Sequence, residues 1–171
     1  MNHRASTTKA KVAILTVSDT RSLEEDRSGA IAMEQLEEAG HQIVHRDIVC
    51  DEVNEITRVV SMWASDADVD AIVVTGGTGP SKRDVTPEAI IPLMTTTMQG
   101  FGELFRQLSY EEIGSASMLS RADAGWIDAG KIRTSVFLLP GSPKAVLLAV
   151  SQLIAPQLGH ILDVCSLEVQ T

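Results

Sequence analysis

The sequence predicts a three-layer αβα fold with a mostly parallel sheet in a single domain. Three short segments, at residues 12–17, 43–49 and 71–75, each have the length of a strand, and the first and third are largely apolar. Helical patterns separate them, as crossovers between parallel strands require. A chain of 171 residues suits one domain with a sizeable core. We expect that domain to span residues 10–171, after a polar, flexible N-terminal tail over residues 1–9.

The first half of the chain alternates predicted strands and helices. Residues 12–17 form an apolar run that includes one threonine, which is typical of a strand buried on both faces. Residues 28–39 predict a helix with an apolar face, and Gly40 ends it. Residues 52–64 place apolar side chains at spacings of 3, 4 and 3, which indicates an amphipathic helix.

The middle of the chain is less regular. We expect helices over residues 100–109 and 110–122. Residues 125–127 and 136–139 predict paired strands around a turn at residues 129–131.

A long helix begins after the last predicted strand. Ser142 suits the N-cap and Pro143 the first helical position. The helix is apolar almost all round, so we expect it to be buried, in part between subunits.

Composition and charge exclude several classes of protein. Hydrophobic residues make up 44% and charged residues 22%, as in an ordinary globular domain. The net charge of −9 argues against nucleic acid as the main partner, which needs a basic face. The polar N-terminus does not fit a signal peptide, and no apolar run approaches the length of a membrane span. Cys50 and Cys165 form no paired motif, so we expect free thiols in a cytoplasmic protein.

The most specific stretch of the chain is a glycine loop between the strand at residues 71–75 and a helix start at residues 85–89. Its sequence is Thr75-Gly76-Gly77-Thr78-Gly79-Pro80-Ser81-Lys82-Arg83-Asp84. Glycines let a ligand approach the backbone, and N–H groups at a helix start face anions. Lys82 and Arg83 add positive charge and Asp84 a carboxylate, which together suggest a metal-assisted phosphate site. The alternative is a flexible turn with no ligand.

This loop matches neither standard nucleotide motif. Ser81 stands where a Walker loop, counted from Gly76, needs its second glycine. Lys82 stands where a dinucleotide fingerprint, counted from Gly77, needs its third.

Residues from three segments are expected to meet at one edge of the sheet. Ser18, Asp51 and Gly76 each lie just past the end of a predicted strand. Ligands of open parallel sheets bind at the carboxyl ends of strands.

Two acidic residues have alternative roles. Asp51 and Asp84 each precede a predicted helix, so each suits an N-cap. Two carboxylates near a polyphosphate are also the usual way in which proteins hold magnesium. Spacing alone favours the cap for Asp51.

Other polar residues are open between a structural and a binding role. Ser18, Asp19 and Thr20 follow the first strand and suit either a polar turn or a ligand contact. Glu103 suits either the first turn of a helix, where it favours the helix dipole, or a site. Pro140 to Lys144 form a second strand–loop–helix joint, in which Gly141 permits close approach and Lys144 could neutralise a phosphate. Ser142 suits an N-cap as well as a binding role.

At these residues the chain resembles the MoaB/MogA family of molybdenum cofactor biosynthesis proteins. The likeness covers about residues 10–165, and residues 108–116 are more similar to the MoaB branch. The blocks that carry it are Leu15 to Arg21, Asp26 to Gly29, Thr75 to Glu88, Gly100 to Glu103 and Leu139 to Lys144.

The resemblance implies a molybdopterin adenylyltransferase that uses ATP and Mg²⁺, or a non-catalytic molybdopterin carrier. It assigns Asp51 and Asp84 to magnesium and catalysis, and the glycine loop to phosphate. It also implies a homo-oligomer, trimer or hexamer, contacts with other proteins of the pathway and no tightly bound prosthetic group. The residues expected to bind substrate are Ser18, Thr75, Gly76, Gly77, Thr78, Gly79, Pro80, Ser81, Lys82, Arg83, Glu103, Pro140, Gly141, Ser142 and Lys144.

Overall fold

Six strands form one sheet in the order β2-β1-β3-β6-β5-β4 in the computed structural model, which describes residues 6–167. Strands β2, β1, β3 and β6 are parallel, and β5 and β4 continue the sheet antiparallel. The mostly parallel α/β fold is thereby confirmed. The strands are β1 (Lys11–Val17), β2 (Gln42–Val49), β3 (Ala71–Thr75), β4 (Thr96–Thr97), β5 (Asp123–Ala129) and β6 (Ile132–Leu139).

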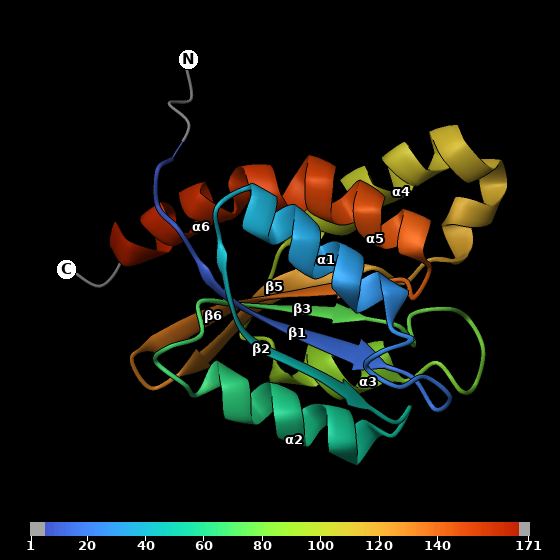
Figure 1. Ribbon diagram of the computed structural model, residues 1–171, viewed down its shortest axis with the longest axis horizontal. Helices are drawn as coiled ribbons and strands as arrows, with labels where there is room; N and C mark the ends of the chain where they lie inside the picture. The colour runs from blue at the N-terminus through green and yellow to red at the C-terminus, as the bar shows by residue number, and fades with distance from the viewer. Residues whose placement is uncertain (1–5, 168–171) are drawn as a thin grey trace.

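Helices cover both faces of the sheet (Figure 1). On one face lie α1 (Arg27–Glu38), α4 (Gln99–Ile113), α5 (Pro143–Ala149) and α6 (Ala155–Leu167). On the other lie α2 (Val53–Ala64) and α3 (Thr86–Ile90), the latter followed by the 3-10 turn η1 (Ile91–Leu93).

Successive residues of the central strands enter two different cores. Ile14 and Val73 pack in the core under α1 and α5, whereas Leu15 and Val74 pack in the core against α2. This is why the sequences of β1 and β3 are apolar without alternation. The edge strand β2 carries more exposed positions and bulges at Val44, where the pairing with β1 shifts register.

The segment after the glycine loop departs from expectation. A single helix, α4, runs to Ile113, and the 3-10 segment η2 (Gly114–Leu119) replaces the helix expected up to residue 122. Gly114 has a φ of 62°, a left-handed conformation that ends an α-helix. The expectation of helix beyond Ile113 was therefore wrong, whereas the β5–β6 pair is confirmed and longer than predicted.

The helix that starts at Pro143 continues through a π-helical turn, η3 (Val150–Ile154), into α6. That turn precedes Pro156, which cannot donate the next helical hydrogen bond. From Pro143 to Cys165 the helix is long and apolar enough to cross a membrane, contrary to the expectation that no apolar run approaches that length. Its residues Val146, Val150 and Ile154 are fully buried in the core of this domain.

The start of the chain contacts the domain within its described part. The hydroxyl of Thr8 donates to the carboxylate of Asp163, and the ammonium of Lys9 donates to the carbonyl of Ala39 at 2.9 Å. Residues 1–5 of the expected tail lie outside the described residues.

Candidate functional site

Loops from four strands meet at the carboxyl edge of the sheet. Ser18, Asp51, Gly76 and Pro140 follow β1, β2, β3 and β6. The N–H of Ser18 donates to the carbonyl of Val49 at 2.9 Å, which joins the first two loops. The N–H of Gly76 donates to the carbonyl of Leu139 at 3.0 Å, which joins the other two.

The glycine loop needs glycine at its first position. Gly76 has a φ of 103°, and a Cβ atom there would lie 2.2 Å from the carbonyl oxygen of Val17 at the end of β1. The hydroxyl of Thr86 donates to the carbonyl of Gly76 at 2.8 Å, so the start of α3 holds the turn.

The carboxylate of Asp51 faces this turn. A Cβ on Gly77 would lie 3.0 Å from Oδ1 of Asp51. Glu52, not Asp51, occupies the N-cap of α2, and it makes no side-chain capping bond. Burial raises the pKa of Asp51 above its ordinary value, and the nearby negative charge of Asp19 raises it further. A half-buried carboxylate with a raised pKa gains from a cation.

Asp84 faces the other end of the same loop. Its Oδ2 accepts the N–H of Ser81 at 2.9 Å and would lie 2.8 Å from a Cβ on Gly79. The N-cap of α3 is Val85, so Asp84 does not cap that helix. The negative charge of Asp84 also raises the pKa of Asp51.

Arg83 forms hydrogen bonds with two acidic side chains. Its guanidinium donates from Nε and Nη2 to Oδ2 of Asp19 at 2.8 and 2.6 Å, and from Nη1 to Glu52 at 3.2 Å. Oδ1 of Asp19 accepts the N–H of Asp51 at 3.0 Å. The guanidinium of Arg83 lowers the pKa of Asp19. Asp19 thus ties the β1, β2 and glycine loops together. From the sequence, the role of Asp19 was open between a polar turn and a ligand contact, and these partners were not predicted.

A small cavity lies beside the glycine loop. Its volume is about 220 Å³, and Thr78, Gly79, Pro140 and Ser142 contribute to its lining. The hydroxyl of Thr78 is buried and has no hydrogen-bond partner among residues 6–167. A buried unpaired hydroxyl is costly, so a ligand that bonds to it would gain affinity.

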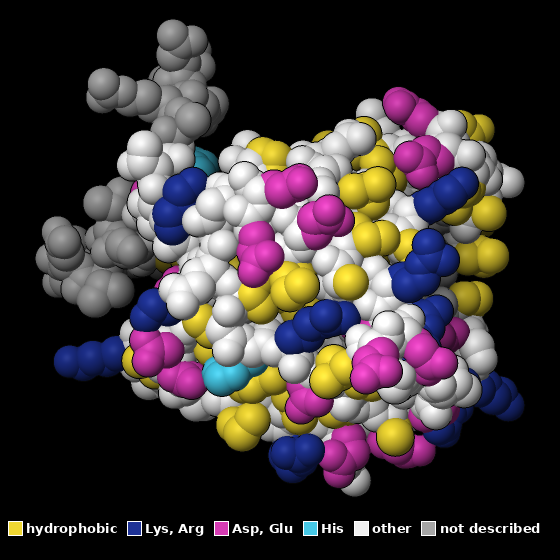
Figure 2. Space-filling model, viewed as in Figure 1, with side chains coloured by type: hydrophobic (Ala, Val, Ile, Leu, Met, Phe, Trp, Pro, Cys, Tyr) yellow, Lys and Arg dark blue, Asp and Glu magenta, His cyan; other side chains and the backbone are white. Residues whose placement is uncertain are grey.

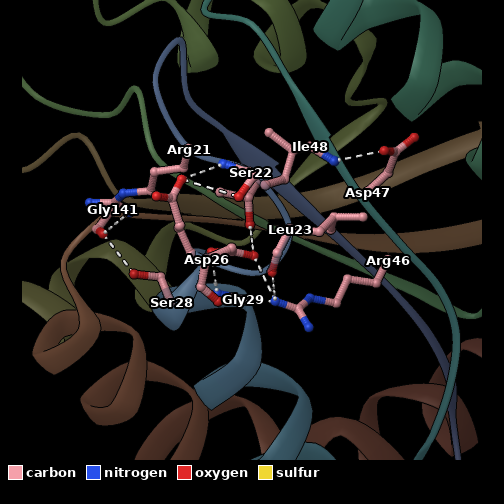
Figure 3. Close-up of polar contacts among 12 residues, drawn as sticks. Arg21, Ser22, Leu23, Asp26, Ser28, Gly29, Arg46, Asp47, Ile48 and Gly141 are labelled. Carbon is pink, nitrogen blue, oxygen red and sulfur yellow. Dashed lines mark hydrogen bonds and ion pairs between the residues drawn. The ribbon is translucent and has the colours of Figure 1, made fainter.

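The second loop is held against the first. A Cβ on Gly141 would lie 3.2 Å from the Cα of Gly76, and the hydroxyl of Thr75 donates to the carbonyl of Pro140 at 3.0 Å. The hydroxyl of Ser28 donates to the carbonyl of Gly141 at 2.8 Å (Figure 3). Ser142 caps α5 as expected, because its hydroxyl accepts the N–H of Ala145 at 3.3 Å.

A buried carboxylate anchors the loop between β1 and α1. Asp26 caps α1 by accepting the N–H of Gly29 at 2.9 Å, and it also accepts the hydroxyl of Thr16 at 2.8 Å. Nη2 of Arg46, on β2, donates to Oδ2 of Asp26 at 3.1 Å (Figure 3). From the sequence, Asp26 was named only as part of the Asp26 to Gly29 block that resembles the family. Its position just before a helix could have predicted its role as an N-cap.

Other expected site residues lie apart from this centre or on its surface. Glu103 lines a different hollow of about 720 Å³, together with Glu88, Arg106 and Arg121. Lys144 is exposed at the start of α5, and Pro80, Ser81 and Lys82 are exposed at the tip of the glycine loop.

The carboxylates fit a magnesium ion that takes most of its ligands from phosphate and water. Within residues 6–167, no group of three or more His, Cys, Asp or Glu side chains is placed to hold a metal ion. Magnesium at nucleotide sites, however, commonly uses one or two carboxylates beside substrate phosphates. Asp51 and Asp84 would hold it, since both flank the glycine loop.

Fold and loops together define a three-layer α/β protein with a glycine loop and paired carboxylates at the carboxyl edge of its parallel strands. Over residues 13–160 the chain matches the family described as "Probable molybdopterin binding domain", and it belongs to that family. It is 50% identical over 149 residues to molybdenum cofactor biosynthesis protein B of Bacillus subtilis (strain 168), covering 86% of this chain and 85% of the relative.

Solved structures agree. A crystal structure of molybdenum cofactor biosynthesis protein B superposes with a TM-score of 0.87 at 45% identity, covering 93% of this chain and 97% of that one. The tungsten cofactor synthesizing protein MoaB from Pyrococcus furiosus superposes with a TM-score of 0.82 at 38% identity, covering 92% and 97%. The MoaB/MogA resemblance is thereby confirmed.

Proposed function

We propose that this protein acts in molybdenum cofactor biosynthesis by binding molybdopterin and adenylylating it with MgATP. The terminal phosphate of molybdopterin attacks the α-phosphorus of ATP. A new P–O–P bond forms, the bond to the β-phosphate breaks, and pyrophosphate leaves. The names of the relatives support the pathway, and the family description supports the pterin ligand.

The observation that carries the adenylyl-transfer step is the pair of carboxylates that face the glycine loop. Asp51 faces Gly77 and Asp84 faces Gly79. A site that only carried an anionic pterin would gain nothing from two negative charges beside its phosphate. The same charges are useful where a divalent cation must be held against triphosphate oxygens.

The chain's own groups would act by alignment and charge neutralisation. The N–H groups of the glycine loop would hold phosphate oxygens, and bound magnesium would supply further positive charge. The buried hydroxyl of Thr78 and the Pro140–Lys144 loop would contact the pterin or the nucleotide, since both border the same cavity. Ser18 would contribute from the end of β1.

The proposal extends to assembly and location. We propose a homo-oligomer, trimer or hexamer, that works in the cytoplasm and meets other proteins of the pathway. Within residues 6–167, neither Cys50 nor Cys165 is part of a disulfide, which is consistent with a reducing compartment.

Pyrophosphate release tests the proposal. We expect release from wild-type protein supplied with molybdopterin, ATP and Mg²⁺, and loss of release in Asp51→Ala and Asp84→Ala. Molybdopterin affinity in both variants should stay the same or tighten slightly, because the carboxylates do not attract an anionic pterin. Glu38→Gln, at the far end of α1, is the control and should keep wild-type rates. Pterin binding by the wild type without pyrophosphate release would favour the carrier function instead.

A further inference from the structure

Arg121 contacts the glycine loop from outside the four loops that form the site. It lies between η2 and β5. Its main-chain N–H donates to the carbonyl of Thr78 at 3.0 Å. Its guanidinium donates from Nε to the carbonyl of Gly79 at 2.9 Å and from Nη2 to the carbonyl of Asp84 at 2.7 Å. Nη1 pairs with the carboxylate of Glu88, on α3.

These bonds fix the orientation of peptide groups in the loop. Because a peptide unit is planar and trans, a carbonyl held on one side turns the following N–H to the other side. The bond to Thr78 therefore directs the N–H of Gly79 away from the main-chain N–H of Arg121. The bond to Asp84 fixes the backbone from which its carboxylate extends.

The guanidinium suits this task better than an ammonium would. Two of its nitrogens reach carbonyls that belong to residues five positions apart in the sequence. A planar fork holds both at a fixed separation, whereas a lysine presents a single charged point. Residues 81–84, which lie between these two carbonyls, form a turn, because the N–H of Asp84 donates to the carbonyl of Ser81 at 3.0 Å. Arg121 joins this turn to the beginning of β5.

We infer that Arg121 is a positioning residue for adenylyl transfer: through its side-chain bonds to the carbonyls of Gly79 and Asp84, it sets the Asp84 carboxylate against the phosphates. This inference rests on the proposed function for its catalytic part. Its structural part, the ordering of the loop by Arg121, can be measured without any substrate.

Loop order is tested by millisecond hydrogen–deuterium exchange on the full-length protein. In Arg121→Met we expect amides of residues 76–86 to exchange about tenfold faster or more, while β1 and α2 keep their wild-type protection. Glu88→Gln removes the ion pair but leaves the carbonyl bonds, so its exchange should match the wild type. Arg58→Met, which removes an exposed arginine on α2, controls for loss of charge. Unchanged exchange across residues 76–86 in Arg121→Met would refute the inference, as would equally raised exchange throughout the chain.

Kinetics test the catalytic part. We expect kcat for pyrophosphate release to fall about tenfold or more in Arg121→Met, since small displacements of aligned groups are costly. Arg121→Lys should keep the wild-type melting temperature but not restore kcat, which separates positioning from folding. Wild-type kcat in Arg121→Lys would refute the role of the fork. Should the wild type release no pyrophosphate, the proposed function fails, and the exchange result still decides whether Arg121 orders the loop.

Discussion

The guanidinium of Arg83 donates two hydrogen bonds to a single carboxylate oxygen of Asp19, at 2.8 and 2.6 Å. This contact joins the glycine loop to the end of β1. It also pairs the positive charge of Arg83, which was expected from the sequence to bind phosphate, with a carboxylate. An incoming phosphate would therefore compete with Asp19 for Arg83.

The Asp19–Arg83 pair predicts a pH-dependent contribution to stability. The pKa of Asp19 is lowered from its ordinary value of 3.8 by Arg83. A carboxyl of this kind stabilises the fold above its unfolded pKa, and the contribution is lost as the pH falls through the folded value. The difference in melting temperature between wild type and Arg83→Gln should therefore shrink as the pH falls below 3.8. A difference in melting temperature that widened below pH 3.8 would contradict the pairing of Asp19 with Arg83. The double variant with Asp19→Asn isolates the coupling.

Asp51→Asn should stabilise the protein at neutral pH, because the pKa of Asp51 is raised by burial and by the charge of Asp19. A carboxyl with a raised pKa contributes stability while protonated and loses it as the pH rises through the folded value. We expect a gain of no more than about 1 kcal/mol, since solvent screens a half-exposed group. Urea denaturation at pH 7 measures it. Destabilisation would instead point to a structural role for this carboxylate.

Alanine at the loop glycines should separate backbone strain from ligand binding. Gly76→Ala places a Cβ atom 2.2 Å from a backbone carbonyl at positive φ, so it should cost roughly 1–3 kcal/mol of stability. Gly77→Ala should also lose stability because its φ is 62°. Gly79→Ala meets only the movable carboxylate of Asp84, so it should keep the fold and weaken ATP binding.

The control for these variants is Gly100→Ala. A Cβ there has no neighbour within 4 Å, and alanine suits the helix. Thermal melting and ATP titration on all four proteins check the ranking. Equal stability of Gly76→Ala and Gly100→Ala would contradict the loop geometry.

Asp26→Ala should be the most damaging of these changes to the fold. The variant leaves Arg46 without its carboxylate and removes acceptors from Thr16 and Gly29, so we expect a loss of about 3 kcal/mol. Asp26→Asn keeps the size of the side chain and one acceptor, and should lose less. The midpoint of urea unfolding gives both values. Wild-type stability in Asp26→Asn would exclude a role for the charge.

Light scattering at micromolar concentration should return the mass of a trimer or hexamer. The structure changes the reason for this expectation, since the helix from Pro143 buries one apolar side, with Val146, Val150 and Ile154, in the core of its own domain. Exposed apolar residues gather instead on and after α4 (Figure 2), and they are Leu104, Tyr110, Ile113, Met118 and Leu119. Ile113→Lys should lower the mass if this surface is the contact. A wild-type monomer would refute the oligomer.

Patterns of local chemistry made much of this fold predictable. The continuous apolar runs of β1 and β3 predicted strands buried on both faces. Gly40, which has a positive φ, marked the end of one helix, and Pro143 marked the start of another. The two-residue β4 was not predicted, because a strand of that length has no periodicity. The 3-10 turn after Ile113 was missed because the expected helix was continued through Gly114, a residue that can end one.

For the candidate site, sequence placed residues at the correct edge but could not assign their partners. Asp51 and Asp84 looked like helix caps by position, and only their geometry shows that neither caps a helix. Arg121 carried no signal at all. It lies 37 residues beyond Asp84, and only the return of the chain at β5 brings them together.

The bulge at Val44 has a consequence for behaviour at high concentration. It interrupts the regular spacing of β2 at one margin of the sheet, where His45 and Asp47 are exposed. At the opposite margin, β4 offers only two residues. Neither margin presents the long, flat, uncharged backbone that a neighbouring molecule needs to extend a sheet. We expect crowded solutions of the folded protein to stay free of fibrils, so that amyloid-like association begins only from unfolded chains.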